Sequence, residues 1–190
     1  VTVGGNFSAT TDANSGVINM GSMAVDGTFT LAPNSTGAVT IVNDAGLALA
    51  ASTMGGTFSG TATTGNITQT GALAITGTTT LTTSANDATI TLGTDSNAFT
   101  GAMTITTNDA SGTDADVTID GGTTALVIAA STVDGDLALR TGNASGITDT
   151  GTVTVGGNFT ATTDANSGVI NMGSMAVDGT FTLAPNSTGA

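Results

Sequence analysis

The chain has 190 residues and a net charge of −13, because 14 acidic residues, all of them Asp, are opposed by the single basic residue Arg140. It contains no Cys, His, Lys, Glu, Trp or Tyr, which excludes disulfides, Cys/His zinc sites and the usual general bases and nucleophiles of enzymes. One arginine cannot neutralise a phosphate backbone, so we expect neither nucleic acid nor an anionic membrane surface as a partner. The longest apolar run, residues 125–130, is far shorter than the roughly 20 residues of a membrane-spanning helix, so no membrane insertion is expected.

A long internal repeat organises the chain. Residues 153–190 match residues 1–38 at 37 of 38 positions, and the one difference is Ser8 against Thr160. Identity at this level indicates a tandem array with a period of 152 residues. We therefore divide the chain into one full period, residues 1–152, and the start of the next period, residues 153–190. Both belong to one continuous fold, which we expect to be part of a longer array.

A shorter unit, apolar-x-Gly-x-apolar, recurs within this period. Its glycines lie 22, 29, 21, 24, 34, 22 and 22 residues apart, so six units of about 25 residues fill the long period. Apolar and polar residues alternate around each glycine, which is the period of a strand, and Gly, Asn and Asp gather between the alternating stretches as turns require. In chain order the motifs are Val3-Gly5-Phe7, Val25-Gly27-Phe29, Met54-Gly56-Phe58, Ile75-Gly77-Leu81, Phe99-Gly101-Met103, Val133-Gly135-Leu137, Val155-Gly157-Phe159 and Val177-Gly179-Phe181. The fourth motif is an exception, because the polar Thr79 stands two positions after its glycine.

Each unit also carries a second alternating stretch, at 18–20, 39–41, 67–69, 89–92, 117–119 and 147–149. A unit of two or three short strands cannot bury its own apolar side, but a stack of such units can. The sequence therefore predicts an all-β fold, a parallel β-solenoid (β-helix) with about 25 residues per lap and six laps per 152-residue period. Laps about 4.8 Å apart would advance the rod by roughly 29 Å per period.

The residues that flank the motif glycines are expected to form inward ladders that run from lap to lap. One ladder would contain the residues two positions before each glycine, and the other those two positions after it. The glycines themselves are expected at corners, where a Cβ would crowd the bend. The residues between these ladder positions are polar or small and should face outward.

Several stretches resemble the repeat regions of filamentous haemagglutinin-like bacterial exoproteins, which are exported by two-partner or autotransporter-type systems. The similar stretches are GNITQTGALAITGTTTLTT (65–83), NAFTGAMTIT (97–106) and AASTVDGDLAL (129–139), and every predicted lap follows the same pattern. The resemblance implies a right-handed parallel β-helix, a location outside the cell or at its surface, and a role as a stalk, adhesin shaft or surface fibre.

Four acidic residues, Asp109, Asp114, Asp116 and Asp120, crowd the longest unit. Oxygen-rich turns of this kind can hold calcium, which takes about 6–8 oxygen ligands. Calcium is the one cofactor that the sequence suggests. The alternative interpretation is that these carboxylates are solvated and keep the rod soluble.

Two further functions are weighed against a purely structural one. Glycan-cleaving enzymes of similar fold use paired carboxylates in a groove, but here the Asp residues lie mostly in turns, so we do not expect an enzyme. Arg140 is interpreted as a solvent-facing strand end, with a pair to Asp136 or Asp149 as the alternative. Outward Thr pairs suggest an ice-binding surface, yet other residues interrupt the ladder, so these threonines are interpreted as exposed strand residues. The pairs are Thr28/Thr30, Thr78/Thr80 and Thr180/Thr182.

The sequence thus favours a non-enzymatic, extracellular structural protein that forms a stiff rod or surface fibre of a bacterium. Its expected partners are neighbouring repeats of the same chain or the same protein. The alternative is the shaft of a secreted adhesin whose longer laps, residues 33–38 and 108–116, contact glycans or proteins of a host or partner cell.

Overall fold

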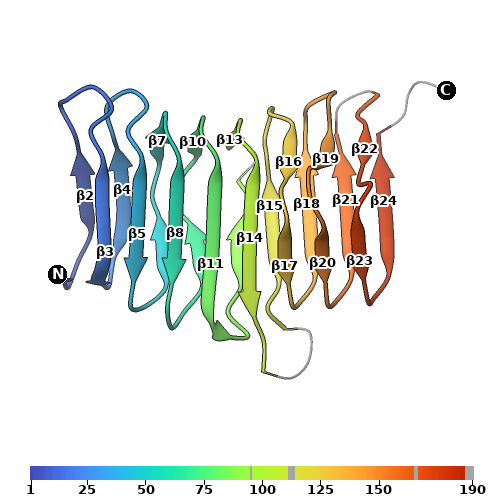
Figure 1. The fold of residues 1–190 in the computed structure, drawn as a ribbon, viewed down its shortest axis with the longest axis horizontal. Coiled ribbons are helices and arrows are strands. Elements are labelled where there is room, and N and C mark those ends of the chain that lie inside the picture. The colour runs from blue at the N-terminus through green and yellow to red at the C-terminus, as the bar shows by residue number, and fades with distance from the viewer. Residues whose placement is uncertain (95, 111–113, 165–166, 187–190) are drawn as a thin grey trace.

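A computed structural model describes residues 1–94, 96–110, 114–164 and 167–186, and it confirms the predicted fold class, a parallel β-solenoid. The laps lie side by side along the long axis, with β2 (Phe7–Thr10) near one end and β24 (Phe181–Pro185) near the other (Figure 1). The solenoid makes about eight turns of about 22 residues. The described residues include no helix that is long and apolar enough to cross a membrane.

The first wall of the solenoid, which we call face 1, is built on a nine-stranded sheet. Its strands are, in spatial order, β2 (Phe7–Thr10), β4 (Thr28–Ala32), β6 (Leu47–Leu49), β9 (Ile67–Gln69), β12 (Ile90–Leu92), β15 (Val117–Asp120), β18 (Leu137–Thr141), β21 (Phe159–Thr163) and β24 (Phe181–Pro185). A three-stranded sheet continues this wall, because its first strand contacts the end of β4. That sheet contains β7 (Ser52–Met54), β10 (Leu73–Ile75) and β13 (Ala98–Phe99).

The second wall, face 2, is a twelve-stranded sheet. Its strands are β1 (Thr2–Val3), β3 (Ile18–Val25), β5 (Val39–Asn43), β8 (Phe58–Ala62), β11 (Thr79–Asn86), β14 (Met103–Asn108), β16 (Leu126–Ile128), β17 (Ser131–Val133), β19 (Ile147–Asp149), β20 (Val153–Val155), β22 (Ile170–Asn171) and β23 (Met175–Val177). Buried and exposed residues alternate along most of these strands, as the sequence predicts, so one row of each strand points into a single hydrophobic core. Phe29, Phe58, Phe99 and Phe159 are among the largest fully buried side chains of that core.

The lap is shorter than the glycine motif predicts, and seven laps, not six, fill the 152-residue period. On face 1 six further strands lie between β2 and β21, which are one period apart in sequence. The discrepancy comes from the two long glycine spacings. Gly27 precedes a strand of face 1 and Gly56 one of face 2, so the 29 residues between them span one lap and a half. The 34 residues from Gly101 to Gly135 also span one lap and a half, and they return the motif from face 2 to face 1. Seven laps advance the rod by about 34 Å.

The motif ladder is therefore divided between the two faces instead of forming one stack. Phe7 pairs in register with Phe29, but the next residue in that row is Leu49 and not Phe58. Phe58 lies on face 2, between Val39 and Thr79. The motif strands of face 2 are β8, β11 and β14, and those of face 1 are β2, β4, β18, β21 and β24. In all these strands the residue two positions after the glycine belongs to the inward-facing set, and the strands differ only in the row to which that residue belongs.

The change of face follows from a half-period that the glycine motif alone does not reveal. The tetrapeptide Ala-Ala-Ser-Thr occurs at 50–53 and again at 129–132, and Val-Thr-Ile precedes it at 39–41 and 117–119. From β5 to β14 and from β15 to β24 the same kinds of strand follow one another, but each lies on the opposite face. Two halves share seven laps, so each half makes about three and a half laps. A half-integer number of laps necessarily brings the second half onto the opposite wall.

The motif glycines lie at corners where successive laps approach closely. Gly101 is packed so tightly on the lap below that a Cβ would collide with the carbonyl oxygen of Gly77, and Gly77 has the same relation to Gly56. Because the colliding atoms are backbone, no side-chain movement could relieve the clash. The predicted role of glycine at the bend therefore holds at these positions.

Candidate functional site

The acidic residues of the longest lap form a small cluster at one turn. Asp87, at the tip of the preceding lap, adopts a left-handed backbone conformation with φ of 62°. A hydrogen bond with the Asp109 side chain, together with desolvation and the negative charges of Asp109 and Asp114, raises the pKa of the exposed Asp87 carboxyl. The backbone N–H of Asp109 donates to Asp134 Oδ2 at 3.0 Å, which brings a further carboxylate from the next lap beside this turn.

The four predicted calcium ligands do not converge on a single point among the described residues. Asp109 and Asp114 belong to the cluster around Asp87, whereas Asp116 and Asp120 have separate hydrogen bonds elsewhere. No group of three acidic side chains in the described part of the chain could hold a metal ion. Residues 111–113, in the middle of this lap, lie outside the described residues. The structure thus gives the calcium hypothesis no support from these four side chains.

The side chains of several Asp and Asn residues instead cap the backbone of the following lap. Asp116 Oδ1 accepts the N–H of Asp136 at 2.8 Å, and Asp136 Oδ1 accepts the N–H of Asn158 at 2.6 Å. Asn158 Oδ1 in turn accepts the N–H of Thr180 at 2.9 Å. Each of these side chains satisfies a donor at a corner where the main-chain ladder is interrupted. This row of Asp and Asn side chains stabilises the contact between successive laps.

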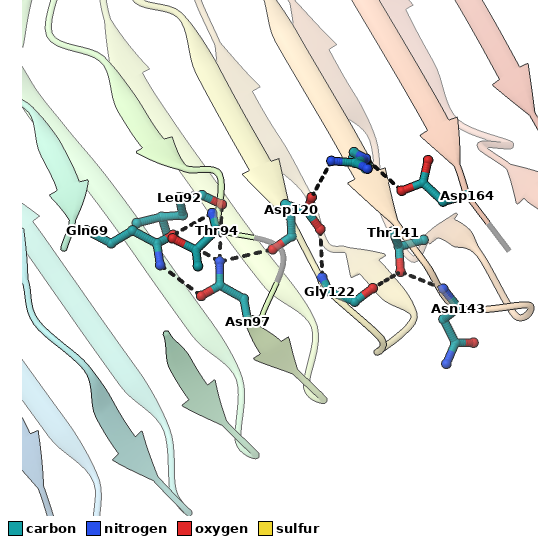
Figure 2. Close-up of polar contacts among 10 residues, drawn as sticks. Gln69, Leu92, Thr94, Asn97, Asp120, Gly122, Thr141, Asn143 and Asp164 are labelled. Carbon is teal, nitrogen blue, oxygen red and sulfur yellow. Dashed lines mark hydrogen bonds and ion pairs between the residues drawn. The ribbon is translucent and has the colours of Figure 1, made fainter. Parts of the chain in front are cut away.

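Arg140 is held between the carboxylates of Asp120 and Asp164, two residues that are labelled in Figure 2. Its Nη1 lies 3.3 Å from Asp120 Oδ2 in the lap before, and its Nε lies 2.7 Å from Asp164 Oδ2 in the lap after. The Asp120 side chain is 6% exposed, and its other oxygen accepts the N–H of Gly122 at 2.7 Å. The sequence expectation of Asp136 or Asp149 as the partner was wrong, because both carboxylates accept backbone N–H groups of the next lap.

The side-chain amides of the buried Asn97 and the half-buried Gln69 form a pair beside this ion pair (Figure 2). Asn97 is 1% exposed, and its Oδ1 accepts Gln69 Nε2 while its Nδ2 donates to Gln69 Oε1, both at 2.9 Å. The same Nδ2 also donates to the carbonyl oxygens of Leu92 and Asp120, and Oδ1 accepts the N–H of Leu73. Every polar atom of Asn97 is therefore satisfied inside the protein, which makes it a structural residue. No local sequence pattern indicates this pair, because its members are 28 residues apart.

The structure describes all of one predicted contact loop and part of the other, and it separates the predicted Thr pairs. The turn at 33–38 stacks on the turn of the preceding lap, where Asn34 Nδ2 donates to the Asp12 carbonyl and Thr36 Oγ1 is 2.7 Å from Ser15 Oγ. Within 108–116, residues 111–113 lie outside the described part of the chain. The three Thr pairs do not form one ladder, because 28/30 and 180/182 lie on face 1 and 78/80 lies on face 2.

Comparison with protein families identifies a match over most of the chain. The model of a family described as repeats of unknown function (DUF5649) matches residues 36–106 and 114–172. Each matched segment contains one Ala-Ala-Ser-Thr sequence, so the two matches fall on the two halves of the 152-residue period. No curated protein matches the chain, and no solved structure matches it.

Proposed function

This chain belongs to the DUF5649 family of repeats of unknown function, and from its architecture we propose that it serves as a stiff structural rod or surface fibre outside a bacterial cell. The observation that carries the proposal is the unbroken parallel stacking of nine strands on face 1, from β2 to β24. Each lap is held to both neighbours by main-chain hydrogen bonds. Bending the rod would stretch many of these bonds at once, so stiffness follows from the architecture itself.

The interior supports the same role. The buried apolar residues of successive laps form one continuous cluster along the described length of the solenoid. Burial of each large side chain contributes about 1.5–3 kcal/mol, and the contribution repeats with every lap. Such a rod gains stability in proportion to its length and needs neither disulfides nor metal ions. A spacer whose length is set by the number of repeats requires this property.

The surface composition favours a rod that stays soluble and separate from its neighbours. With a net charge of −13, copies of the chain repel one another at neutral pH. The proposed extracellular location and the absence of catalytic activity rest on the resemblance to filamentous haemagglutinin-like repeats and on the missing His, Cys, Lys and Glu side chains. Several of the Asp carboxylates cap backbone groups, pair with Arg140, or lie together in the turn around Asp87.

Electron microscopy of the purified protein, and of a version with several joined periods, tests the proposal. We expect thin rods whose length grows by about 34 Å per 152-residue period, with a layer line near 4.8 Å along the axis. Compact particles, or rods whose length does not follow the number of periods, would show that the laps do not form a spacer. Antibody labelling of intact bacterial cells then tests the location, since a cytoplasmic rod would remain unlabelled.

An adhesin shaft is the alternative use of the same rod. It predicts that substitutions in the turns at 33–38 and 108–116 abolish attachment to glycans or partner cells while the rod dimensions stay the same. The stacking of the first turn on the lap before it does not favour this alternative. Attachment that survives such substitutions would favour the spacer role over the adhesin shaft.

A further inference from the structure

Face 2 carries a regular outward patch of hydroxyl groups where three long strands lie side by side. In three successive laps the outward residues are Ser59 and Thr61 on β8, Thr80 and Thr82 on β11, and Thr104 and Thr106 on β14. They are in register across the sheet, so the six side chains form three rows and two columns. We call these six residues the hydroxyl patch. Figure 1 shows its three strands running alongside one another.

The spacing of the hydroxyl patch is set by the backbone. Neighbouring strands place equivalent side chains about 4.8 Å apart, and alternate residues of one strand are about 6.7 Å apart. One column continues beyond the patch, because Thr106 is in register with Thr132 and Thr132 with Thr154. The grid is rigid, since every position stands on a hydrogen-bonded strand with a buried residue on either side.

The hydroxyl groups of the patch are available to solvent. All six residues are half-buried or exposed, and none of their side chains is hydrogen-bonded to another described residue. Each hydroxyl can donate one hydrogen bond and accept two, so the patch can bind a layer of water at fixed positions. The methyl groups beside the hydroxyls restrict where that water can lie.

The patch contains no charge, no aromatic ring and no large apolar side chain. Protein interfaces depend on buried aromatic and Arg side chains, and ligand sites are concave and apolar, so neither kind of partner fits this grid. The corresponding surface of the second half differs. There Arg140 takes the place of Thr61, and Arg140 is in register with Thr162, the counterpart of Thr82. The chain thus carries an interrupted version of the same surface on face 1.

We infer that the hydroxyl patch of face 2 binds ice, through water molecules held on a rigid grid of Thr and Ser hydroxyls and Thr methyl groups. The two spacings of the grid are close to oxygen repeats on crystal planes of ice. Because the grid is fixed before binding, little entropy is lost when it orders the water layer that joins the crystal. A charged group would impose its own orientation on that water, and the patch has none. The inference goes beyond the role as a rod and does not depend on it.

The inference is tested by slowly freezing a dilute solution of the 190-residue protein and measuring the fraction incorporated into the ice. Thr82→Lys adds a long charged side chain at the centre of the patch, and Thr106→Lys repeats the change on the next lap. Thr162→Lys is the matched control, because it places the same side chain on the counterpart strand of face 1. All three positions point outward, and melting curves followed by circular dichroism verify that each variant folds.

We expect the parent protein and Thr162→Lys to concentrate in the ice, and Thr82→Lys and Thr106→Lys to remain mostly in the liquid. Exclusion of the parent protein from ice, at the level of an inert protein such as albumin, would overturn the inference. Equal loss in the patch and control variants would also overturn it, because ice would then be bound elsewhere. Sedimentation tests whether the patch instead binds a second copy of the chain. If the parent protein is a dimer and Thr82→Lys is a monomer, the patch binds a second copy and not ice.

Discussion

Ser52 and Ser131 make the same two hydrogen bonds on opposite faces of the solenoid. Ser52 Oγ accepts the N–H of Leu31 at 2.9 Å and donates to the Ala50 carbonyl, while Ser131 Oγ accepts the N–H of Ile105 at 3.0 Å and donates to the Ala129 carbonyl. Both serines lie where an unbroken strand of one lap meets a strand broken in two in the next lap. The break would leave a backbone N–H without a partner, and the serine hydroxyl supplies one.

Replacing either serine by Ala is therefore expected to destabilise the solenoid by about 1–3 kcal/mol, the cost of one unsatisfied buried donor. Chemical denaturation of Ser52→Ala and Ser131→Ala measures the effect, and the two losses should be similar. Ser59→Ala, at an outward position on β8, is the control and should change the free energy of unfolding by no more than about 0.5 kcal/mol. Losses as small in the two variants as in the control would mean that the hydroxyls do not stabilise the break.

Replacing Thr79 is expected to stabilise the solenoid, in contrast to the serine substitutions. It stands in the row where Phe58 and Met103 are its neighbours, and its Oγ1 is buried without a hydrogen-bond partner among the described residues. Thr79→Val keeps the shape and removes the unpaired hydroxyl, so the free energy of unfolding should rise by about 1–2 kcal/mol. The same substitution at the outward Thr80 should give no comparable gain. An unchanged melting temperature for Thr79→Val would indicate that this hydroxyl is satisfied in solution.

Arg140 contributes to stability mainly through Asp120, whose side chain is the more buried of its two partners. Arg140→Gln is expected to cost about 1–2 kcal/mol, because a nearly buried carboxylate loses its counter-charge. Asp164→Asn should cost less than about 1 kcal/mol, since the Asp164 side chain is 44% exposed and its ion pair is screened by solvent. Urea denaturation of both variants, at low and at high salt, measures the difference. A larger loss for Asp164→Asn would reverse this assignment.

The difference in stability between the parent protein and the Asp87→Asn variant should depend on pH. Its pKa in the folded protein lies above the ordinary value of 3.8, so the proton is bound more tightly in the folded state than in the unfolded state. The resulting stabilisation is complete below pH 3.8 and is lost as the pH rises through the raised pKa. Asp87→Asn keeps an uncharged side chain at every pH and tolerates the left-handed backbone of this position.

We therefore expect Asp87→Asn to melt at a higher temperature than the parent protein at pH 7, with a difference that disappears in acid. Asp109→Asn removes the carboxylate that shares the hydrogen bond, and it should show the same trend. Differential scanning calorimetry between pH 3 and pH 7 follows both variants. A difference that grows on acidification would contradict the proposed cause.

The exposure of the last described strand predicts the effect of one additional lap. Phe29 and Leu31 are fully buried because β6 and β7 lie over β4, whereas the identical residues one period later, Phe181 and Leu183, are 49% and 45% exposed. Adding the sequence of residues 39–62 after Ala190 should cover both side chains and raise the free energy of unfolding by at least about 1 kcal/mol. A scrambled extension of the same composition should give no gain. Equal midpoints for the two extensions would show that the added lap does not stack.

The fold class was predictable because side-chain alternation and turn residues recur throughout the chain, whereas the lap count was not. Gly27 and Gly56 look like neighbours in one series, although one lies on face 1 and the other on face 2. The repeated Ala-Ala-Ser-Thr at 50–53 and 129–132 was the available signal, since it marks both places where the motif changes face. Recognition of that half-period would have predicted seven laps.

The partners of polar side chains were harder to predict than the core. Arg140 is close in sequence to Asp136 but pairs with Asp120 and Asp164, because its neighbours across the sheet are separated from it by a whole lap. The amide pair of Gln69 and Asn97 could not be predicted for the same reason. Lap lengths vary with the turns, so the residue that stands above a given side chain cannot be read from a constant spacing.

The sequence by itself determined which residues point inward, where the chain turns, and that the laps repeat, because each of these depends on local alternation, on glycine and on identity between periods. The tertiary structure decided which wall each strand occupies and which side chains meet across laps. The physical reason is that both walls use the same two-residue alternation. The strand that contains Phe58 on face 2 therefore has the same local pattern as the strand that contains Phe29 on face 1. Only the number of residues in the intervening laps decides which face each strand occupies.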